Sequence, residues 1–344
     1  MNDLNRVLPD IVESIRSNRR VLARLLTRVI NRQADEALAA LYPFTGQAHV
    51  IGVTGAPGTG KSSLVSALAH YYRGEKRTVG IVAVDPTSPF SGGAILGDRI
   101  RMYDLAGDPG VFIRSMATRG ALGGLAAATG DVMRVLDAAG FDVILIETVG
   151  AGQSEVDIAQ TAQTTLVVEA PGFGDDIQAI KAGILEIADI LVVNKADHPD
   201  APNTVRALRA MLDLGHRAER TLHHGYLLSG HLPDQRLPDE NNAWQTPIVQ
   251  TIATGATIES VAGISELAAQ ITAHRAYLQS SGTLATRQQA NLNCEITDRL
   301  RDALLTQLLD NVDPVQLSDL MTQVTTRTLD PASVVRLLLA QFNG

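Results

Sequence analysis

The 344-residue chain contains very little cysteine, lysine and aromatic side chain. Its single cysteine is Cys294, which excludes an internal disulfide and a metal site built from several thiolates. One thiol is typical of a reducing compartment, and we expect the protein to be cytoplasmic. No apolar run approaches about 18 residues, so we expect no membrane-spanning segment.

Positive charge is also scarce, with 29 basic against 37 acidic residues and a net charge of −8. This balance argues against binding to nucleic acid and to an anionic membrane surface. The first 20 residues have no apolar core and contain three acids, so we expect neither a signal peptide nor a transit peptide. Only four basic residues are lysines, which favours specific roles for them. Three of the four lie in motif-like segments: Lys61, Lys181 and Lys195.

Apolar periodicity divides the chain into three regions. Helical spacing predicts an N-terminal helical region over 1–46. Over 47–280, short runs rich in valine and isoleucine alternate with helical patterns, which predicts an α/β domain with a mainly parallel sheet flanked by helices. Residues 281–344 are helical and leucine-rich, and we expect them to pack on the α/β domain or to pair with another subunit. The strand candidates are 49–53, 79–84, 111–113, 143–146, 165–168, 190–193 and 248–252, and the helix candidates of this domain include 62–72, 122–139, 175–187 and 258–278.

The strongest local signal is a glycine-rich turn between a strand candidate and a helix candidate. Residues 55–62 match the phosphate-binding pattern G-x-x-x-x-G-K-[ST] in full. Such a loop turns main-chain N–H groups toward one point, and the following helix adds its positive end. We expect Lys61 to reach the β- and γ-phosphates of a nucleotide and the Ser62 hydroxyl to bind Mg²⁺; the alternative is a turn without a ligand. The expected contacts are Gly55, Ala56, Pro57, Gly58, Thr59, Gly60, Lys61, Ser62 and Ser63.

A second motif, N-K-x-D, indicates which base the nucleotide carries. Asn194, Lys195 and Asp197 follow the strand candidate 190–193. A carboxylate at the end of this loop can accept from N1–H and N2–H₂ of guanine, and adenine offers no such donor pair. An ordinary strand-to-helix turn is the alternative. We expect a further base-contacting loop after the last strand, with Thr251 and Ala253.

Three acids are candidates for the magnesium site, together with Ser62. Glu147 ends a strand candidate, and Gly150 follows it and can present its N–H to the γ-phosphate. Asp85 and Asp98 flank a loop rich in glycine, serine and proline, which suits a segment that closes on metal and phosphate. The alternatives are a turn aspartate before proline for Asp85 and a helix cap for Asp98.

Two further features concern hydrolysis and regulation. Ala151 stands where a water-positioning glutamine would directly follow Gly150, and Gln153 comes two residues later. We therefore expect slow intrinsic hydrolysis that needs a partner. Lys181 lies in a helix candidate that follows a glycine-bearing loop. One interpretation is structural, with Asp175 as the cap of this helix. The other is functional, with Lys181 in contact with the nucleotide, a switch segment or a partner protein.

Together these segments resemble one family, the MeaB/ArgK group of P-loop GTPases. The resemblance covers about residues 20–280. An E-x-x-G motif in place of D-x-x-G, and a long G-G-x-x-L-G-D-R loop, separate this group from Ras-like GTPases. The matching stretches are GAPGTGKSS at 55–63, VDPTSPFSGGAILGDRIRM at 84–102, FIRSMATRGALGGLA at 112–126, ILIETVGAGQSE at 144–155, PGFGDDIQAIKAGILE at 171–186 and NKAD at 194–197.

The resemblance implies a homodimeric GTPase that uses GTP/GDP and Mg²⁺. It implies a chaperone of an adenosylcobalamin-dependent acyl-CoA mutase, such as methylmalonyl-CoA mutase, that gates cofactor loading and protects the mutase. It places dimerisation in the helical C-terminus and a partner-responsive loop at 171–186, with Lys181 as its functional lysine. By matching position, the residues implied in catalysis or metal binding are Lys61, Ser62, Asp85, Asp98, Glu147 and Lys181, and those implied in guanine recognition are Asn194, Lys195 and Asp197.

Two other functional classes are alternatives to this GTPase chaperone. The first is an ATP-dependent kinase or transport ATPase, against which Asp197 and the lack of a membrane segment argue. The second is a metallochaperone GTPase, which uses cysteine and histidine ligands. This chain has one cysteine and eight histidines, with His223 and His224 as the only adjacent pair.

Overall fold

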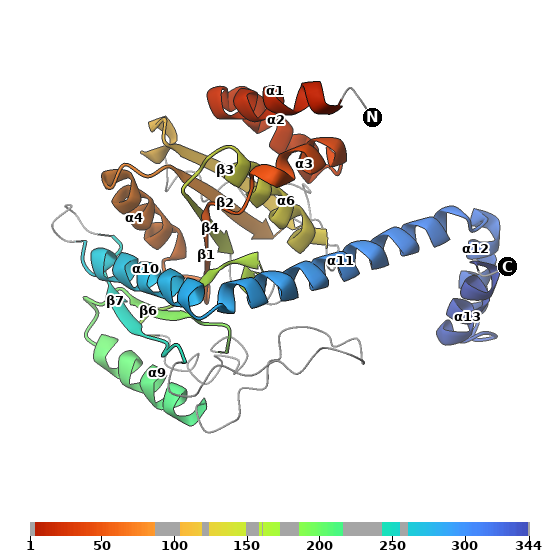
Figure 1. Cartoon of the computed structure of the whole chain (residues 1–344). Coiled ribbons are helices and arrows are strands. Elements are labelled where there is room, and N and C mark those ends of the chain that lie inside the picture. Colours follow the sequence, from red (N-terminus) through yellow and green to blue (C-terminus); the bar gives the residue numbers. More distant parts are fainter. Residues whose placement is uncertain are drawn as a thin grey trace. The chain divides into compact units, whose positions relative to one another are not determined.

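Seven parallel strands form one sheet in the computed structural model (Figure 1). The structure describes residues 4–86, 104–118, 124–148, 158–159, 161–172, 186–215, 243–254 and 261–342. The strand order is β3-β2-β4-β1-β5-β6-β7, and each neighbouring pair is parallel. The strands are β1 (His49–Thr54), β2 (Val79–Pro86), β3 (Val111–Thr118), β4 (Val143–Thr148), β5 (Thr164–Glu169), β6 (Ile190–Asn194) and β7 (Ile248–Thr251).

All seven strand candidates are confirmed. Consecutive apolar residues predicted them because both faces of the sheet are covered, and every residue of β4, β5 and β6 is buried. The expected strand lengths differ most at β3, which continues to Thr118 instead of ending at residue 113. β3 lies at the edge of the sheet, where Arg114 and Ser115 are only half-buried, so polar side chains can continue the strand.

Helices cover both faces of the sheet. α4 and α10 share one core with alternate strand residues such as Ile51 and Leu145, while α2, α3 and α6 share another with Val82 and Ile146. The expected N-terminal helices therefore form a layer on the sheet, and α9 packs against β6 and β7. The elements are α1 (Leu4–Ser17), α2 (Arg19–Ile30), α3 (Asp35–Leu41), η1 (Tyr42–Phe44), α4 (Lys61–Gly74), η2 (Leu105–Gly107), α6 (Gly124–Ala138), α9 (Ala201–Gly215) and α10 (Ile264–Ser280).

The predicted helix over 258–278 begins later than expected. Ile252 and Ala262 form an isolated antiparallel bridge, and α10 starts only at Ile264. Gly263 makes the turn with φ +77°, and a Cβ there would lie 2.0 Å from the carbonyl oxygen of Gln250. Only glycine fits this close approach. The candidate over 175–187 lies outside the described residues apart from its last two positions.

The chain separates into two compact units, residues 1–291 and 292–344. The first unit extends beyond the sequence-based boundary at residue 281 and includes the first turns of α11 (Thr283–Asp310). The second contains the rest of α11 with α12 (Pro314–Thr325) and α13 (Pro331–Phe342). Among its described residues only Leu320 and Val334 are buried. Several large apolar side chains of α11 are exposed along the helix: Leu292, Ile296, Leu300, Leu304, Leu305 and Leu309.

A buried polar network lies at the amino ends of the strands, in the first unit. His49 at the start of β1 and His274 of α10 each lie 2.9 Å from the Thr164 hydroxyl at the start of β5. His274 Nε2 lies 3.2 Å from Asp189, which precedes β6. Arg287 of α11 donates to the same carboxylate at 2.9 and 3.2 Å. The network joins β1, β5 and β6 to the two helices.

Candidate functional site

The glycine-rich loop lies where β1 meets α4, at the carboxyl ends of the strands. Gly55, Gly58 and Gly60 have φ angles of +138°, +82° and +91°. A Cβ on Gly55 would lie 2.1 Å from the carbonyl oxygen of Val168 on β5. The motif's first glycine is therefore required because the loop passes directly against the neighbouring strand. In parallel sheets this edge is the usual place for ligands.

The Lys61 ammonium is held inside the curl of this loop. Its Nζ donates to the carbonyl oxygens of Gly55 and Ala56 at 2.8 and 2.9 Å, and the side chain is only 6% exposed. The Thr59 hydroxyl donates to Ala56 O at 2.9 Å and closes the turn. A buried cation surrounded by main-chain groups suits the binding of phosphate oxygens.

Ser62 and Glu147 come together beside the loop. Ser62 Oγ donates to Glu147 Oε1 at 2.5 Å, and both side chains are buried. The contact exists because β4 pairs with β1, with Glu147 in register with Val53. One hydroxyl and one carboxylate oxygen form the hard donor set that Mg²⁺ prefers, so these residues fit the expected metal.

Asn194 connects the phosphate loop to the last strand. It is 2% exposed, and its Nδ2 donates to Thr59 O at 2.9 Å. Its Oδ1 accepts from Thr251 Oγ1 at 3.2 Å and from Ala253 N at 3.1 Å. A Cβ on Gly60 would lie 2.4 Å from Asn194 Nδ2. Sequence reasoning assigned Asn194 to the base and missed this role as the brace between two loops.

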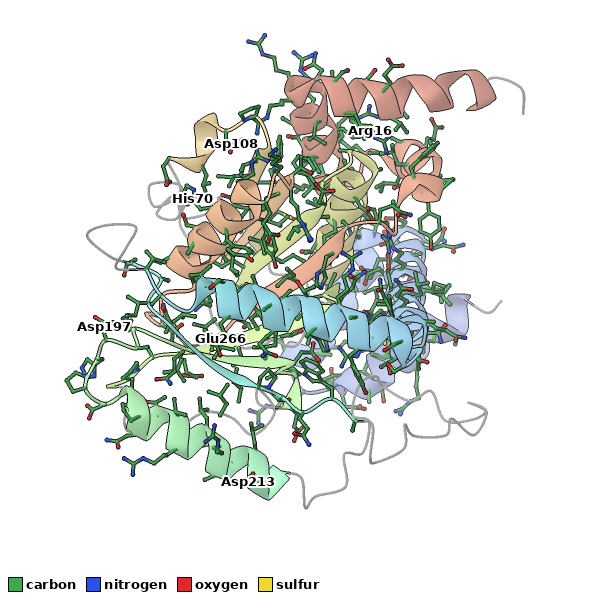
Figure 2. The ribbon with its side chains drawn as sticks, turned by 60° about the vertical axis from the view of Figure 1, so that its left-hand side comes forward. Arg16, His70, Asp108, Asp197, Asp213 and Glu266 are labelled. Carbon is green, nitrogen blue, oxygen red and sulfur yellow. The ribbon has the colours of Figure 1, made fainter. Side chains whose placement is uncertain are left out.

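Lys195 extends the same connection and positions Asp197. Its backbone has φ +58°, and Nζ donates to the carbonyl oxygen of Gly58 at 2.8 Å. The main-chain N–H of Ala196 donates to Thr251 O at 3.0 Å. Asp197 is exposed beyond the end of β6 (Figure 2), so its carboxylate can be reached by a ligand that lies across the lysine stem.

The structure thus brings together predicted residues of the phosphate loop, Glu147, Asn194, Lys195, Thr251 and Ala253. Arg114, in the motif-like segment 112–126, donates to Thr27 Oγ1 on α2 at 3.2 Å. Asp85 is the last residue but one of β2, and its side chain is not among those that the structure describes. Also outside the described residues are Asp98, Gly150, Gln153, Asp175 and Lys181.

Sequence reasoning missed one contact at this edge. Thr148 donates its hydroxyl to Thr54 Oγ1 at 3.1 Å, and both side chains are buried. The bond ties the end of β4, beside Glu147, to the end of β1, beside Gly55. A threonine directly before the glycine-rich motif is the signal that could have indicated it.

Comparison with known proteins decides the family. The sequence profile described as methylmalonyl Co-A mutase-associated GTPase MeaB matches residues 22–313. The chain belongs to the MeaB family of GTPases. The expected resemblance and the P-loop NTPase fold are therefore confirmed, and this MeaB-family protein is a GTPase that converts GTP and water to GDP and phosphate.

Individual proteins that are similar to this MeaB-family GTPase support the family assignment. A Pyrococcus abyssi protein named as a GTPase is 42% identical over 341 residues, covering 98% of each chain. The Escherichia coli GTPase ArgK is 40% identical over 57% of this chain and 62% of its own. The mouse methylmalonic aciduria type A homolog is 38% identical over 54% of this chain and 45% of its own. A crystal structure titled LAO/AO transport system kinase covers 100% of this chain and 99% of its own, with 25% identity and a TM-score of 0.68.

Among the described residues, no helix of this MeaB-family GTPase combines the length and the apolar character needed to cross a bilayer.

Proposed function

We propose that this MeaB-family GTPase uses GTP and Mg²⁺ to chaperone an adenosylcobalamin-dependent acyl-CoA mutase such as methylmalonyl-CoA mutase. The family description and the name of the mouse relative support the mutase. The observation that carries the nucleotide part is Asn194, which bonds to the phosphate loop on one side and to the loop after β7 on the other. One side chain thereby couples the two halves of a nucleotide site.

Different site residues bind the phosphates, the Mg²⁺ ion and the guanine base. Lys61 and the main-chain N–H groups of the loop bind the β- and γ-phosphates. Ser62 and Glu147, with Asp85 and Asp98 as further proposed ligands, hold Mg²⁺, which when bound neutralises charge on the phosphate oxygens. Asp197 accepts from the guanine N1–H and N2–H₂, and Lys195 lies along the base.

Base recognition is tested by calorimetric titration with GDP and ADP, each with Mg²⁺. We expect GDP to bind, ADP not to bind, and Asp197→Ala to lose GDP binding, because the variant lacks the carboxylate that pairs with the guanine edge. Asp213→Ala is the control, since Asp213 is exposed on α9 and labelled in Figure 2. Equal or preferred binding of ADP would overturn guanine recognition and return attention to an ATP-dependent kinase or ATPase.

The chaperone role is tested with purified methylmalonyl-CoA mutase loaded with adenosylcobalamin. We expect GTP hydrolysis to be slow alone and faster with the mutase, because Ala151 replaces a water-positioning glutamine. The mutase should also lose activity more slowly during turnover when the GTPase and GTP are present. If neither rate changes while GDP still binds, the nucleotide site stands and the proposed client is wrong.

A further inference from the structure

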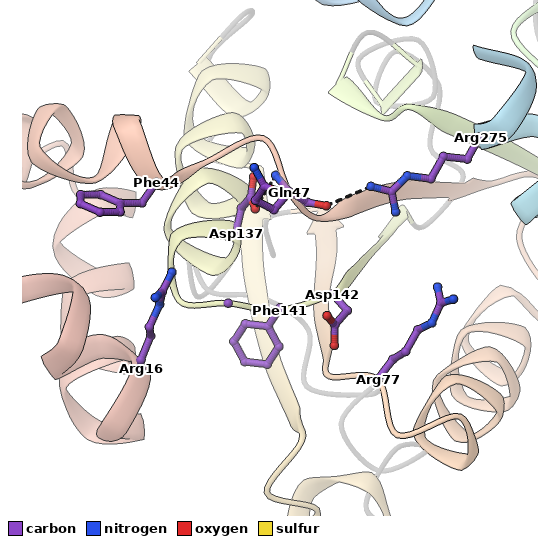
Figure 3. Close-up of a pocket in the computed structure, with 9 residues that line it drawn as sticks. Arg16, Phe44, Gln47, Arg77, Asp137, Phe141, Asp142 and Arg275 are labelled. Atoms are coloured by element: carbon purple, nitrogen blue, oxygen red, sulfur yellow. Dashed lines mark hydrogen bonds between the residues drawn. The ribbon is translucent and has the colours of Figure 1, made fainter. Parts of the chain in front are cut away.

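A cavity of about 450 Å³ opens at the amino ends of the strands, on the edge of the sheet opposite to the phosphate loop. We call it the amino-edge pocket. Gln47 lies just before β1, Arg77 just before β2 and Asp142 just before β4, while Arg16 and Arg275 reach it from α1 and α10. Figure 3 shows Arg77 and Arg275 on one side of the pocket and Arg16 with Phe44 on the other.

Three guanidinium groups therefore face one cavity in a chain whose net charge is −8. Arg16 Nε donates to Ala138 O at 3.0 Å, and Arg275 Nη2 donates to Gln47 O at 2.9 Å. Within the described part of the chain neither makes an ion pair with a carboxylate. Arg77 has a single distant one, 3.7 Å from Glu75 Oε2. Most of their N–H donors are thus available to an anion.

The two carboxylates of the pocket, Asp137 and Asp142, accept hydrogen bonds from main-chain N–H groups. Asp137 accepts from the main-chain N–H groups of Gly46, Gln47 and Ala48, which fixes the entry to β1. Asp142 Oδ2 accepts from the N–H and the hydroxyl of Thr78 at 2.7 and 2.8 Å, which fixes the entry to β2. These acids neutralise the three arginines only in part.

Arg77 and Arg275 lie close enough to influence each other's charge, although Asp137 offsets part of this effect on Arg275. The pKa of Arg275 is lowered by burial and then by the charge of Arg77. His49, beside them at the start of β1, has its pKa lowered by burial, with Arg275 and Arg77 among the further causes. Arg77 and Arg275 therefore repel each other, and an anion between them would relieve that repulsion.

We propose that the amino-edge pocket binds a small phosphate monoester, with the phosphate between Arg77 and Arg275 and the organic part against Phe44 and Phe141. A dianion matches two guanidinium groups, each of which can donate two N–H bonds. The volume lies within the range of small-molecule sites, about 300–1,000 Å³. The site is separate from the nucleotide site and does not depend on the proposed mutase partner.

Binding is tested by calorimetric titration of phenyl phosphate into full-length protein saturated with Mg²⁺ and a non-hydrolysable GTP analogue. The analogue occupies the phosphate loop, so heat from the probe reports a second site. We expect millimolar or tighter binding that weakens at high salt. Inorganic phosphate, titrated in a second arm, should bind more weakly because it lacks the aromatic part.

Arg275→Gln and Arg77→Gln should each weaken phenyl phosphate binding at least about tenfold, the loss of one charge-assisted hydrogen bond. Arg209→Gln, on an exposed arginine of α9, is the matched control. Affinity for the GTP analogue, measured in parallel, should stay unchanged in all three variants and shows that each is folded. No binding at millimolar probe, or equal affinity in Arg275→Gln and the control, would overturn the proposal.

Discussion

At the scale of single residues, some side chains of the proposed nucleotide site have both a predicted ligand contact and a structural role. Asn194 and Lys195 belong to a base-recognition motif, yet in the structure both bond to the main chain of the phosphate loop. Gly60 is required in part because Asn194 occupies the space of its Cβ. The two motifs are therefore physically linked, and a change in one is expected to disturb ligand contacts of the other.

Replacing Asn194 by alanine tests this link. The variant leaves the buried Thr59 carbonyl and Ala253 N–H without their partner, which we expect to lower the free energy of unfolding by about 1 to 3 kcal/mol. GDP affinity should fall more than that of Asn203→Ala, an exposed asparagine on α9. Urea unfolding and calorimetry measure the two effects. Unchanged stability together with unchanged GDP affinity would show that the brace is unimportant.

Glu147 provides a second test at this scale. Glu147→Gln removes the charge but keeps an oxygen that can accept from Ser62, so the fold should remain. We expect the Mg²⁺ concentration needed for half-maximal GTP hydrolysis to rise at least about 10-fold, because even residues that only orient metal ligands typically contribute 10- to 100-fold to metal affinity. Glu266→Gln, on an exposed glutamate of α10 labelled in Figure 2, is the control. The same Mg²⁺ dependence in both variants would exclude Glu147 from the metal site.

At the scale of elements, the sheet has a different chemistry at each edge. The carboxyl ends of β1, β4 and β6 carry the nucleotide site, and the amino ends of β1, β5 and β6 carry the buried polar network. Burial alone would raise the pKa of the Asp189 carboxyl, but His274 and Arg287 outweigh it and lower the pKa to about 2. The pKa of His49 is lowered to about 3, first by burial and then by Arg275, His274 and Arg77.

These shifts predict that the fold weakens as the pH falls. Neutral His49 is retained in the folded state, whereas the unfolded chain takes up a proton below about pH 6.5, so stability is lost from there down to about pH 3. We expect a loss of about 2 kcal/mol between pH 7 and pH 5 from this side chain. The Asp189 contribution is lost only below about pH 4, outside that interval.

Urea unfolding at pH 7 and pH 5 measures the effect. His49→Gln keeps a side-chain amide that can hydrogen-bond to the Thr164 hydroxyl but cannot titrate, so its stability should change less between the two values. His198→Gln, at an exposed histidine, is the matched control and should retain the wild-type slope. Identical slopes in His49→Gln and wild type would contradict the assignment.

At the scale of the whole molecule, the second unit has little core of its own. Six large apolar side chains of α11 are exposed, and four of them, Leu292, Ile296, Leu300 and Leu304, recur at intervals of one helical turn. A continuous apolar stripe of this kind is typical of a surface that another chain covers. We therefore propose that the homodimer expected for this family forms through residues 292–344.

Light scattering after size-exclusion chromatography tests the dimer. We expect wild-type protein at twice the 36.6 kDa mass of one chain, and Leu300→Glu with Leu304→Glu at the mass of one chain. Burying two carboxylates in an apolar interface is costly, which is why the double variant should dissociate. Gln307→Glu adds charge at an exposed polar position of α11 and should stay dimeric. A wild-type monomer would refute this role of the stripe.

The sequence by itself determined the strands and the phosphate loop. Strands covered on both faces are apolar at consecutive positions, and the phosphate loop needs its glycines at set positions, so both leave local patterns. Local patterns could not show that β3 extends to Thr118 or that α10 starts at Ile264, because an edge position and a bridge to Ile252 decide those limits.

Only the tertiary structure decided which residues meet. The contacts of Asn194 with Thr59, of Ser62 with Glu147, and of Arg287 with Asp189 join residues about 85 to 135 positions apart. Arg114 belongs to a motif-like segment, yet it bonds to Thr27 on the N-terminal helices. The amino-edge pocket likewise collects arginines from two helices and a loop that are far apart in the sequence. Such long-range contacts follow from the strand order and the helix packing, which the spacing of residues within a short segment does not encode.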